Sequence, residues 1–145
     1  MVIDKLSEAL FPNDGDGNTS PPTLSPEVGA AGLLIEAAHR DGAFTEVEQD
    51  LVTAALMKLF RLTNPKAKAL REEAASAQAA STTSMTFAAA AKGLPADLRE
   101  GLVTQMWTVA DSDDDLSGME REVMGTVQTM FGLSRERLLA LRPSA

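Results

Sequence analysis

The sequence predicts an all-α protein, and three observations point to that fold class. Aromatic residues make up only 4% of the 145 residues, and alanine is abundant, which favours packed helices over a β-sheet core. Apolar residues recur at helical spacing in one segment after another, and no useful stretch alternates with the period of two that marks a β-strand. The length suits one compact domain. We therefore expect a bundle of about seven helices.

The N-terminal part of the chain differs in pattern from the rest. Ile3, Leu6 and Leu10 share one face of a short helix predicted over residues 1–11, which makes this helix amphipathic. Residues 12–25 are rich in Asn, Asp, Gly, Ser, Thr and Pro, a composition typical of a flexible linker. A helix this short is marginal in water, so we expect it to dock on the domain, on a partner or on a lipid surface.

The first two helices of the main domain, which we expect over residues 26–142, are marked by their ends. Pro26 suits a first helical turn, the Asp41-Gly42 pair ends the first pattern, and Thr45 begins the second helix. The apolar positions are Val28, Ala31, Ile35 and Ala38 in the first helix, and Leu51, Val52, Ala55, Leu56 and Leu59 in the second.

Two further helices follow, separated by a polar break. Asn64-Pro65 begins the third helix, which ends in the break from Ser81 to Ser84. A short fourth helix is predicted from about Met85 to Lys92, where Gly93 ends it. The apolar positions of the third helix are Ala67, Leu70, Ala74 and Ala77.

The last three helices are predicted to begin at Pro95, Ser117 and Ser134. We expect Trp107, beside the apolar stripe of the fifth helix, to anchor the core, and most methionines to fill gaps in it. The apolar positions are Leu98, Leu102, Met106 and Val109 in the fifth helix, and Met119, Val123, Val127 and Met130 in the sixth.

Two stretches of the chain share one design, which predicts an internal repeat. Each has an Asp, a large apolar residue, a hydroxyl residue and a Glu at the same spacing, followed by a Phe-x-Leu sequence. We expect two pseudo-symmetric helix-loop-helix units that pack together, because neither can bury its apolar stripe alone. The shared residues are Asp41, Phe44, Thr45 and Glu48 in the first stretch, and Asp113, Leu116, Ser117 and Glu120 in the second.

The shared residues have two interpretations. Thr45-x-x-Glu48 and Ser117-x-x-Glu120 each match the capping box, in which the hydroxyl and the Glu side chain satisfy the first backbone amides of a helix. Capping does not explain why an Asp precedes each box. In the other interpretation, each turn gathers oxygen ligands for a cation.

The second turn holds the densest group of acids. Six carboxylates and one basic residue, Arg121, lie within twelve residues of the sequence. The repulsion among these carboxylates is relieved most simply by a divalent cation. Oxygen ligands favour Ca²⁺ or Mg²⁺. Leu116 replaces the glycine that an EF-hand loop requires, so this is not an EF-hand. A solvated acidic turn is the alternative. The acids are Asp111, Asp113, Asp114, Asp115, Glu120 and Glu122.

Glu36-x-x-His39 matches half of the ligand set of di-iron helical bundles. Such a centre needs two of these pairs, and the chain has one histidine. We therefore expect His39 to lie at the surface or at the helix end, with Glu36 paired to Arg40.

Composition also excludes several functions. The net charge of −8 disfavours binding to nucleic acid. The absence of cysteine and the single histidine leave little for nucleophilic catalysis, so we expect no enzyme. No apolar run is long enough for a membrane span, and the N-terminus lacks a secretory pattern. We expect a cytoplasmic protein, with peripheral contact at the inner membrane through residues 2–11.

Residues 33–48 and 107–120 resemble the two signatures of the TerB family, bacterial helical proteins named for tellurite-resistance operons. The resemblance covers about residues 26–142. It implies a bundle with pseudo-two-fold symmetry, and a divalent-cation site. Ala43 stands where the family often has an acid, which makes the second turn the better site. The family's acidic positions fall on Glu36, Asp41, Glu48, Asp113, Asp115 and Glu120.

The resulting hypothesis is a non-enzymatic TerB-like module that binds Ca²⁺ or Mg²⁺ weakly and serves a stress response, such as tellurite resistance, through protein partners near the inner membrane. The alternative is a structural protein-interaction domain whose acidic turns only cap helices. The candidate cation ligands are Asp113, Asp115, Glu120, Asp111, Glu122, Asp41, Glu48 and Glu36.

Overall fold

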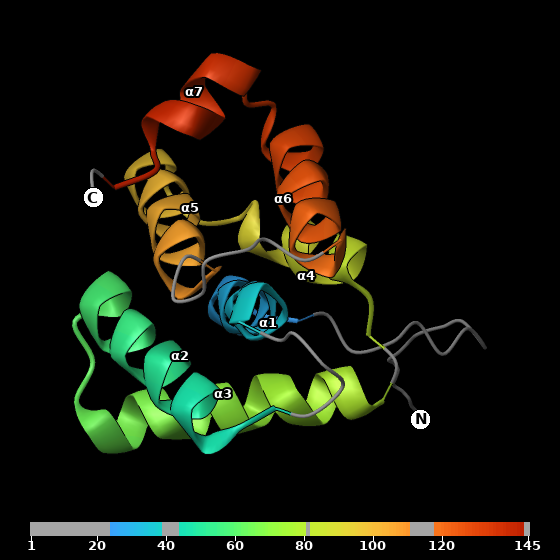
Figure 1. Cartoon of the computed structure of the whole chain (residues 1–145). Coiled ribbons are helices and arrows are strands. Elements are labelled where there is room, and N and C mark those ends of the chain that lie inside the picture. The colour runs from blue at the N-terminus through green and yellow to red at the C-terminus, as the bar shows by residue number, and fades with distance from the viewer. Residues whose placement is uncertain (1–23, 39–43, 81, 111–117, 144–145) are drawn as a thin grey trace, which may run out of the picture.

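The computed structural model describes residues 24–38, 44–80, 82–110 and 118–143, which fold into seven α-helices without a β-strand (Figure 1). The all-α prediction and the predicted order of helices in the domain are therefore confirmed. The helix predicted over residues 1–11 and most of the predicted linker lie outside the described residues. The helices are α1 (Pro26–Ala38), α2 (Glu46–Phe60), α3 (Asn64–Ala79), α4 (Ser84–Ala91), α5 (Ala96–Ala110), α6 (Gly118–Phe131) and α7 (Arg135–Ala140).

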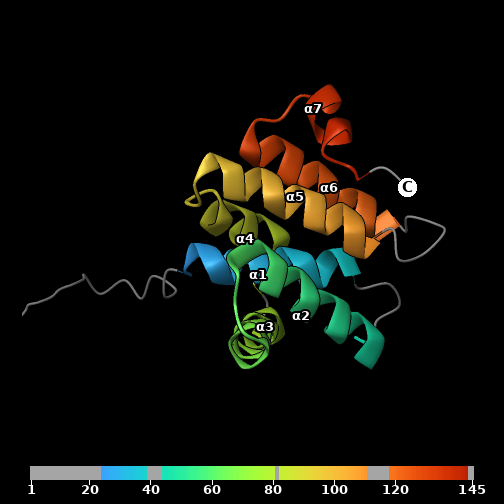
Figure 2. The ribbon, with the colours of Figure 1, turned by 90° about the vertical axis from the view of Figure 1, so that its left-hand side faces the viewer.

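Helix α1 runs through the centre of the bundle. It contacts α2 and α3 on one side and α4, α5 and α6 on the other (Figures 1 and 2). Every residue from Val28 to Ala38 is buried. A helix that is apolar all round belongs in a protein interior, and Glu36 is the one charged residue in this stretch. The apolar spacing predicts a single buried stripe here, so the burial of the whole circumference is a correction.

Two glycines allow α4 to cross α1 at close range. A Cβ atom built on Gly29 would lie 2.5 Å from the backbone oxygen of Phe87, and one built on Gly32 would lie 2.4 Å from the Phe87 ring. The Phe87 side chain is fully buried. Glycine at these positions therefore lets the aromatic ring sit directly on the α1 backbone.

The two predicted repeats end in the same way. Arg61 after α2 and Gly132 after α6 both adopt positive φ angles, of 55° and 66°. In each case the following leucine amide donates a hydrogen bond back into the helix, from Leu62 to the Met57 oxygen at 3.1 Å and from Leu133 to the Gln128 oxygen at 3.0 Å. This bonding is the Schellman pattern of a helix C-terminus. The Phe-x-Leu sequences are thus equivalent caps.

Helix α7 docks on α5 through polar contacts around Trp107. The indole Nε1 of Trp107 donates to the Leu138 carbonyl at 3.0 Å, and Thr104 Oγ1 donates to the Leu141 carbonyl at 2.8 Å. Trp107 is 4% exposed, which confirms its predicted role as a core anchor. Arg137 donates to both carboxylate oxygens of Glu100 at 2.9 and 2.5 Å. This pairing lowers the pKa of Glu100 and raises the pKa of Arg137.

Among the described helices, none has the length and apolar character that a membrane span needs.

Candidate functional site

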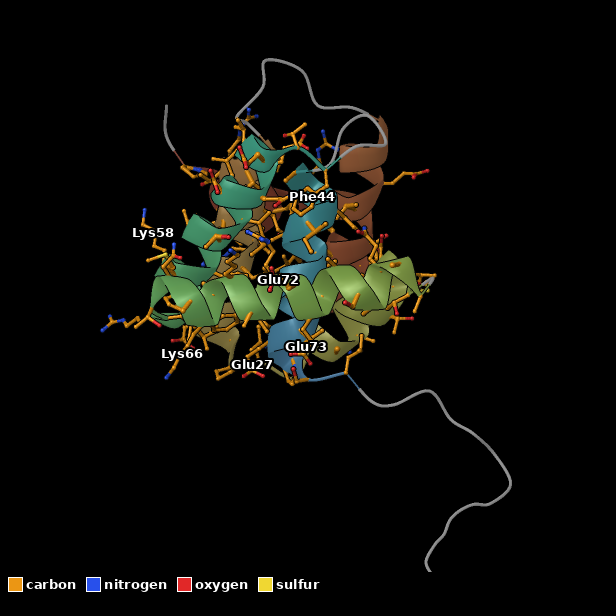
Figure 3. The ribbon with its side chains drawn as sticks, turned by 90° about the horizontal axis from the view of Figure 1, so that it is seen from below. Glu27, Phe44, Lys58, Lys66, Glu72 and Glu73 are labelled. Atoms are coloured by element: carbon orange, nitrogen blue, oxygen red, sulfur yellow. The ribbon has the colours of Figure 1, made fainter. Side chains whose placement is uncertain are left out.

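Both helix-loop-helix units reverse direction at the same end of the bundle, which we name the turn end. In Figure 2, α1 and α5 end at this edge of the molecule, and α2 and α6 begin there. In Figure 3, Phe44 lies at the turn end and Glu27 lies at the opposite end of α1. All eight candidate cation ligands belong to the two turns or to the adjoining helix ends.

The described residues include the side chains of three of these eight candidates, which are Glu36, Glu48 and Glu122. For Glu120 the structure gives a backbone position in the first turn of α6. The predicted ligands that lie outside the described residues are Asp41, Asp111, Asp113 and Asp115.

Glu36 is a nearly buried carboxylate at the C-terminal end of α1. Its residue is 8% exposed and lies in the last turn of α1, which contains no basic residue. A carboxylate is disfavoured both by burial and by the negative end of a helix dipole. Its Oε1 atom accepts a hydrogen bond from Ser84 Oγ at the start of α4. The Glu36–Arg40 pair predicted from the sequence involves a residue outside the described part of the chain.

Glu122 lies on an open groove between α4 and α6, which we name the α4–α6 groove. This groove has a volume of about 480 Å³. Ser84, the hydrogen-bond donor to Glu36, also lines it. One serine thus links a carboxylate of the first repeat to a groove that holds a carboxylate of the second. The lining residues are Ser84, Met85, Glu122, Gly125, Thr126, Thr129 and Met130.

Glu48 is engaged in capping α2. Its Oε1 atom accepts a hydrogen bond from the Thr45 amide at 2.9 Å, and Thr45 Oγ1 accepts one from the Glu48 amide at 3.2 Å. The capping-box interpretation is therefore confirmed for the first repeat. The equivalent box of Ser117 and Glu120 lies outside the side chains that the structure describes.

Within the described residues, no group of three or more His, Asp or Glu side chains is close enough to hold a metal ion. Glu36 and Glu122 would therefore need carboxylates from residues 39–43 or 111–117 to complete a coordination sphere. Carboxylate and hydroxyl oxygens are the donors that Ca²⁺ and Mg²⁺ prefer, so the chemistry of the candidates fits these cations.

Two features of the site were missed from the sequence. The sequence does indicate the burial of Glu36, because this residue is the one acid in an otherwise apolar segment from Val28 to Ala38. Nothing in the sequence indicates that Ser84 donates a hydrogen bond to Glu36, because the two residues are 48 positions apart in the chain.

A protein-family model described as "Tellurite resistance protein TerB" matches residues 27–142. The chain belongs to the TerB family. In this TerB-family chain, the match spans both sequence signatures and the helices from α1 to α7, and it confirms the resemblance that those signatures suggest. No curated protein and no solved structure gave a match.

Proposed function

We propose that this TerB-family chain is a non-enzymatic helical module that binds a divalent cation, Ca²⁺ or Mg²⁺, weakly at the turn end. The observation that carries the proposal is that α1 and α5 end, and α2 and α6 begin, at the same end of the bundle (Figure 2). The cation would relieve the repulsion among the carboxylates of the two turns that join these helix ends. Asp113, Asp115 and Glu120 are the central ligands in this proposal, and Asp111, Glu122, Asp41, Glu48 and Glu36 are further candidates.

The environment of Glu36 supports the same proposal. Removing a carboxylate from water is favourable only when hydrogen bonds or opposite charge compensate it. Ser84 supplies one hydrogen bond, and a carboxylate that is oriented by a hydrogen bond is suited to ligate a cation. The open α4–α6 groove offers such an ion a route from solvent along Glu122.

The cellular part of the proposal starts from the family description, which names tellurite resistance. We propose that the module serves a stress response of this kind by engaging protein partners in the cytoplasm. Contact of residues 2–11 with the inner membrane surface would place it near those partners. An amphipathic helix of this kind binds a lipid interface through its apolar face.

Calorimetric titration of the full chain with CaCl₂ and MgCl₂ tests cation binding directly. The matched pair of variants is D113N/D115N, which removes two candidate ligands, and E72Q/E73Q, which removes two charges from the outer face of α3, away from the turn end (Figure 3). We expect binding heat for the wild type and for E72Q/E73Q, and its loss in D113N/D115N. At ten times the dissociation constant, bound cation would stabilise the fold by roughly 1.4 kcal/mol, which a melting curve detects.

The absence of both heat and thermal shift at millimolar cation would refute the proposal, and so would equal responses from the two double variants. E36Q adds a test of the buried carboxylate, because the amide keeps the shape of the side chain and removes its charge. We expect weaker cation binding in E36Q.

A second candidate function is a structural protein-interaction domain whose acidic turns only cap helices. The complete capping box of Thr45 and Glu48 favours it. In that case, deleting residues 1–24 would abolish the capture of partner proteins and leave the melting curve unchanged, and added cation would have no effect on either.

A further inference from the structure

Helix α6 is bordered by two grooves that share Gly125. One is the α4–α6 groove, and the other lies between α5, α6 and α7, with a volume of about 280 Å³. We name the second the α7 groove. A Cβ atom built on Gly125 would meet no atom within 4 Å, so the backbone of α6 faces open space here. The residues lining the α7 groove are Trp107, Met124, Gly125, Gln128, Arg135, Leu138 and Leu139.

The α7 groove is apolar at its base and basic at its rim. Trp107, Met124 and Leu138 are buried residues that line it, whereas Leu139 is 47% exposed. A groove lined mostly by apolar side chains can receive the apolar side chains of a partner. Arg135 also lines the groove and is exposed, so the partner that fits carries apolar side chains together with acids.

We propose that, in the absence of lipid, residues 2–11 of the same chain dock in the α7 groove as an amphipathic helix. Their apolar stripe of Ile3, Leu6 and Leu10 matches a mostly apolar lining, in which Leu139 is the exposed apolar residue and Arg142 lies over the ring of Trp107 at 5.0 Å. A helix laid by its apolar face into a groove is a common recognition mode. Docking also gives this short helix the tertiary contacts that it needs in water.

Charge favours the same pairing. Residues 2–11 contain one lysine against two carboxylates, and Arg135 is the basic residue that lines the α7 groove. Asp4 and Glu8 lie on the polar side of the predicted helix, where Arg135 at the groove rim can pair with one of them. Opposite charges at the edge of an interface steer and orient a partner.

The intervening chain is long compared with the helices of the domain. Fully extended, residues 12–23 span at most about 40 Å, which is about twice the length of α1 at 1.5 Å per residue. Leu24 packs against the core ahead of α1, so the chain leaves the domain from a fixed point. The intervening segment is therefore longer than any one helix of the domain, which is compatible with docking on the same molecule.

A single spin label tests the proposal, because the chain contains no cysteine. A nitroxide on Asn13→Cys stands just beyond the proposed helix and leaves its apolar face intact. In the full chain we expect paramagnetic broadening of the amide resonances of Gln128 and Leu139 and none at Glu73 on α3. The further change Leu6→Gln should abolish the broadening, whereas Lys5→Gln, on the polar side, should preserve it.

Two outcomes would overturn the proposal. The first is the absence of broadening at the α7 groove, which would send the segment to another partner or to lipid. The second is broadening of an isotope-labelled chain by a spin-labelled copy mixed with it, which would identify a second molecule as the occupant. Neither outcome bears on cation binding, because this test contains no added cation.

Gly125 supplies a variant that blocks the groove without disturbing the core. Its Cβ position is open, so Gly125→Leu should fold with an unchanged or raised melting temperature and still lose the broadening at Leu139. Gly125→Ala, with a smaller side chain, should retain it. Persistence of the broadening in a folded Gly125→Leu variant would contradict docking at this place.

Discussion

Replacing Gly32 with alanine tests how α1 and α4 pack. The new Cβ atom would lie 2.4 to 2.5 Å from three atoms of the Phe87 ring. Real Cβ atoms do not approach other atoms so closely, so the ring or a helix must move. The ring is fully buried, and α1 is enclosed by five other helices, so neither moves freely.

The expected loss of stability follows from two opposing effects. Overpacking a well-packed core costs about 1–3 kcal/mol, and the closeness of this contact points to the upper part of that range. Alanine in place of glycine within a helix returns about 1 kcal/mol. We therefore expect Gly32→Ala to reduce the free energy of unfolding by about 2 kcal/mol, a fall of roughly 4–8 °C in melting temperature for a domain of this size.

Urea and thermal unfolding measure this change, with Gly125→Ala as the matched control. Gly125 is also inside a helix, but its Cβ position is open, so this variant should gain about 0.5–1 kcal/mol. Adding Phe87→Leu to Gly32→Ala should cost less than the two single changes together, because it removes part of the clashing ring. Equal stability of the two alanine variants would refute the packing described for Gly32.

Two further predictions concern polar contacts between helices. Arg71 is buried, and its Nη1 atom donates a hydrogen bond to Thr53 Oγ1 at 2.7 Å. Thr53→Val should therefore lower the free energy of unfolding, measured with denaturant, by about 1–3 kcal/mol. The exposed control Thr108→Val should change it by less than about 0.5 kcal/mol. Arg137 lowers the pKa of Glu100 in the folded state, so this pair stabilises the fold above the usual pKa of a glutamate and loses that effect as pH falls through the lowered value. In Arg137→Gln, NMR titration should show the Glu100 pKa raised toward its usual value. An unchanged pKa would contradict the contact.

Helix positions in this chain were predictable because local signals agree with the fold. Thr45 with Glu48, and Ser134 alone, cap the helices that they were expected to begin. Helix α4 begins at Ser84, one residue before the expected start, because the Thr83 side chain accepts a hydrogen bond from the Thr86 amide and caps the helix. Capping is decided within four residues, so a sequence pattern records it directly.

The central position of α1 was harder to predict because long-range packing decides it. Gly29 and Gly32 lower helix propensity, and their close contacts with α4 become visible only when Phe87 is placed beside them. The surroundings of Glu36 were hard to predict for the same reason. Its position in the chain was recognised as a candidate, but its burial and its contact with Ser84 depend on how α4 crosses α1.

The acidic residues of the two repeats differ in which interpretation they favour, helix capping or cation binding. Glu48 caps its helix, which accounts for its spacing from Thr45 without any cation. The aspartates that precede each box, Asp41 and Asp113, have no part in that capping box. The helix ends that flank the two turns lie at one end of the bundle (Figure 2), and the cation proposal rests on that arrangement.

The most direct test of the central claim is an NMR titration of the isotope-labelled full chain with CaCl₂. The claim is that both turns contribute to one cation site. It predicts that the amide resonances of Gly42 in the first turn and Gly118 in the second shift together with a single dissociation constant, and that D113N/D115N weakens both responses. Shifts confined to one turn, or none at millimolar Ca²⁺, would contradict a shared site.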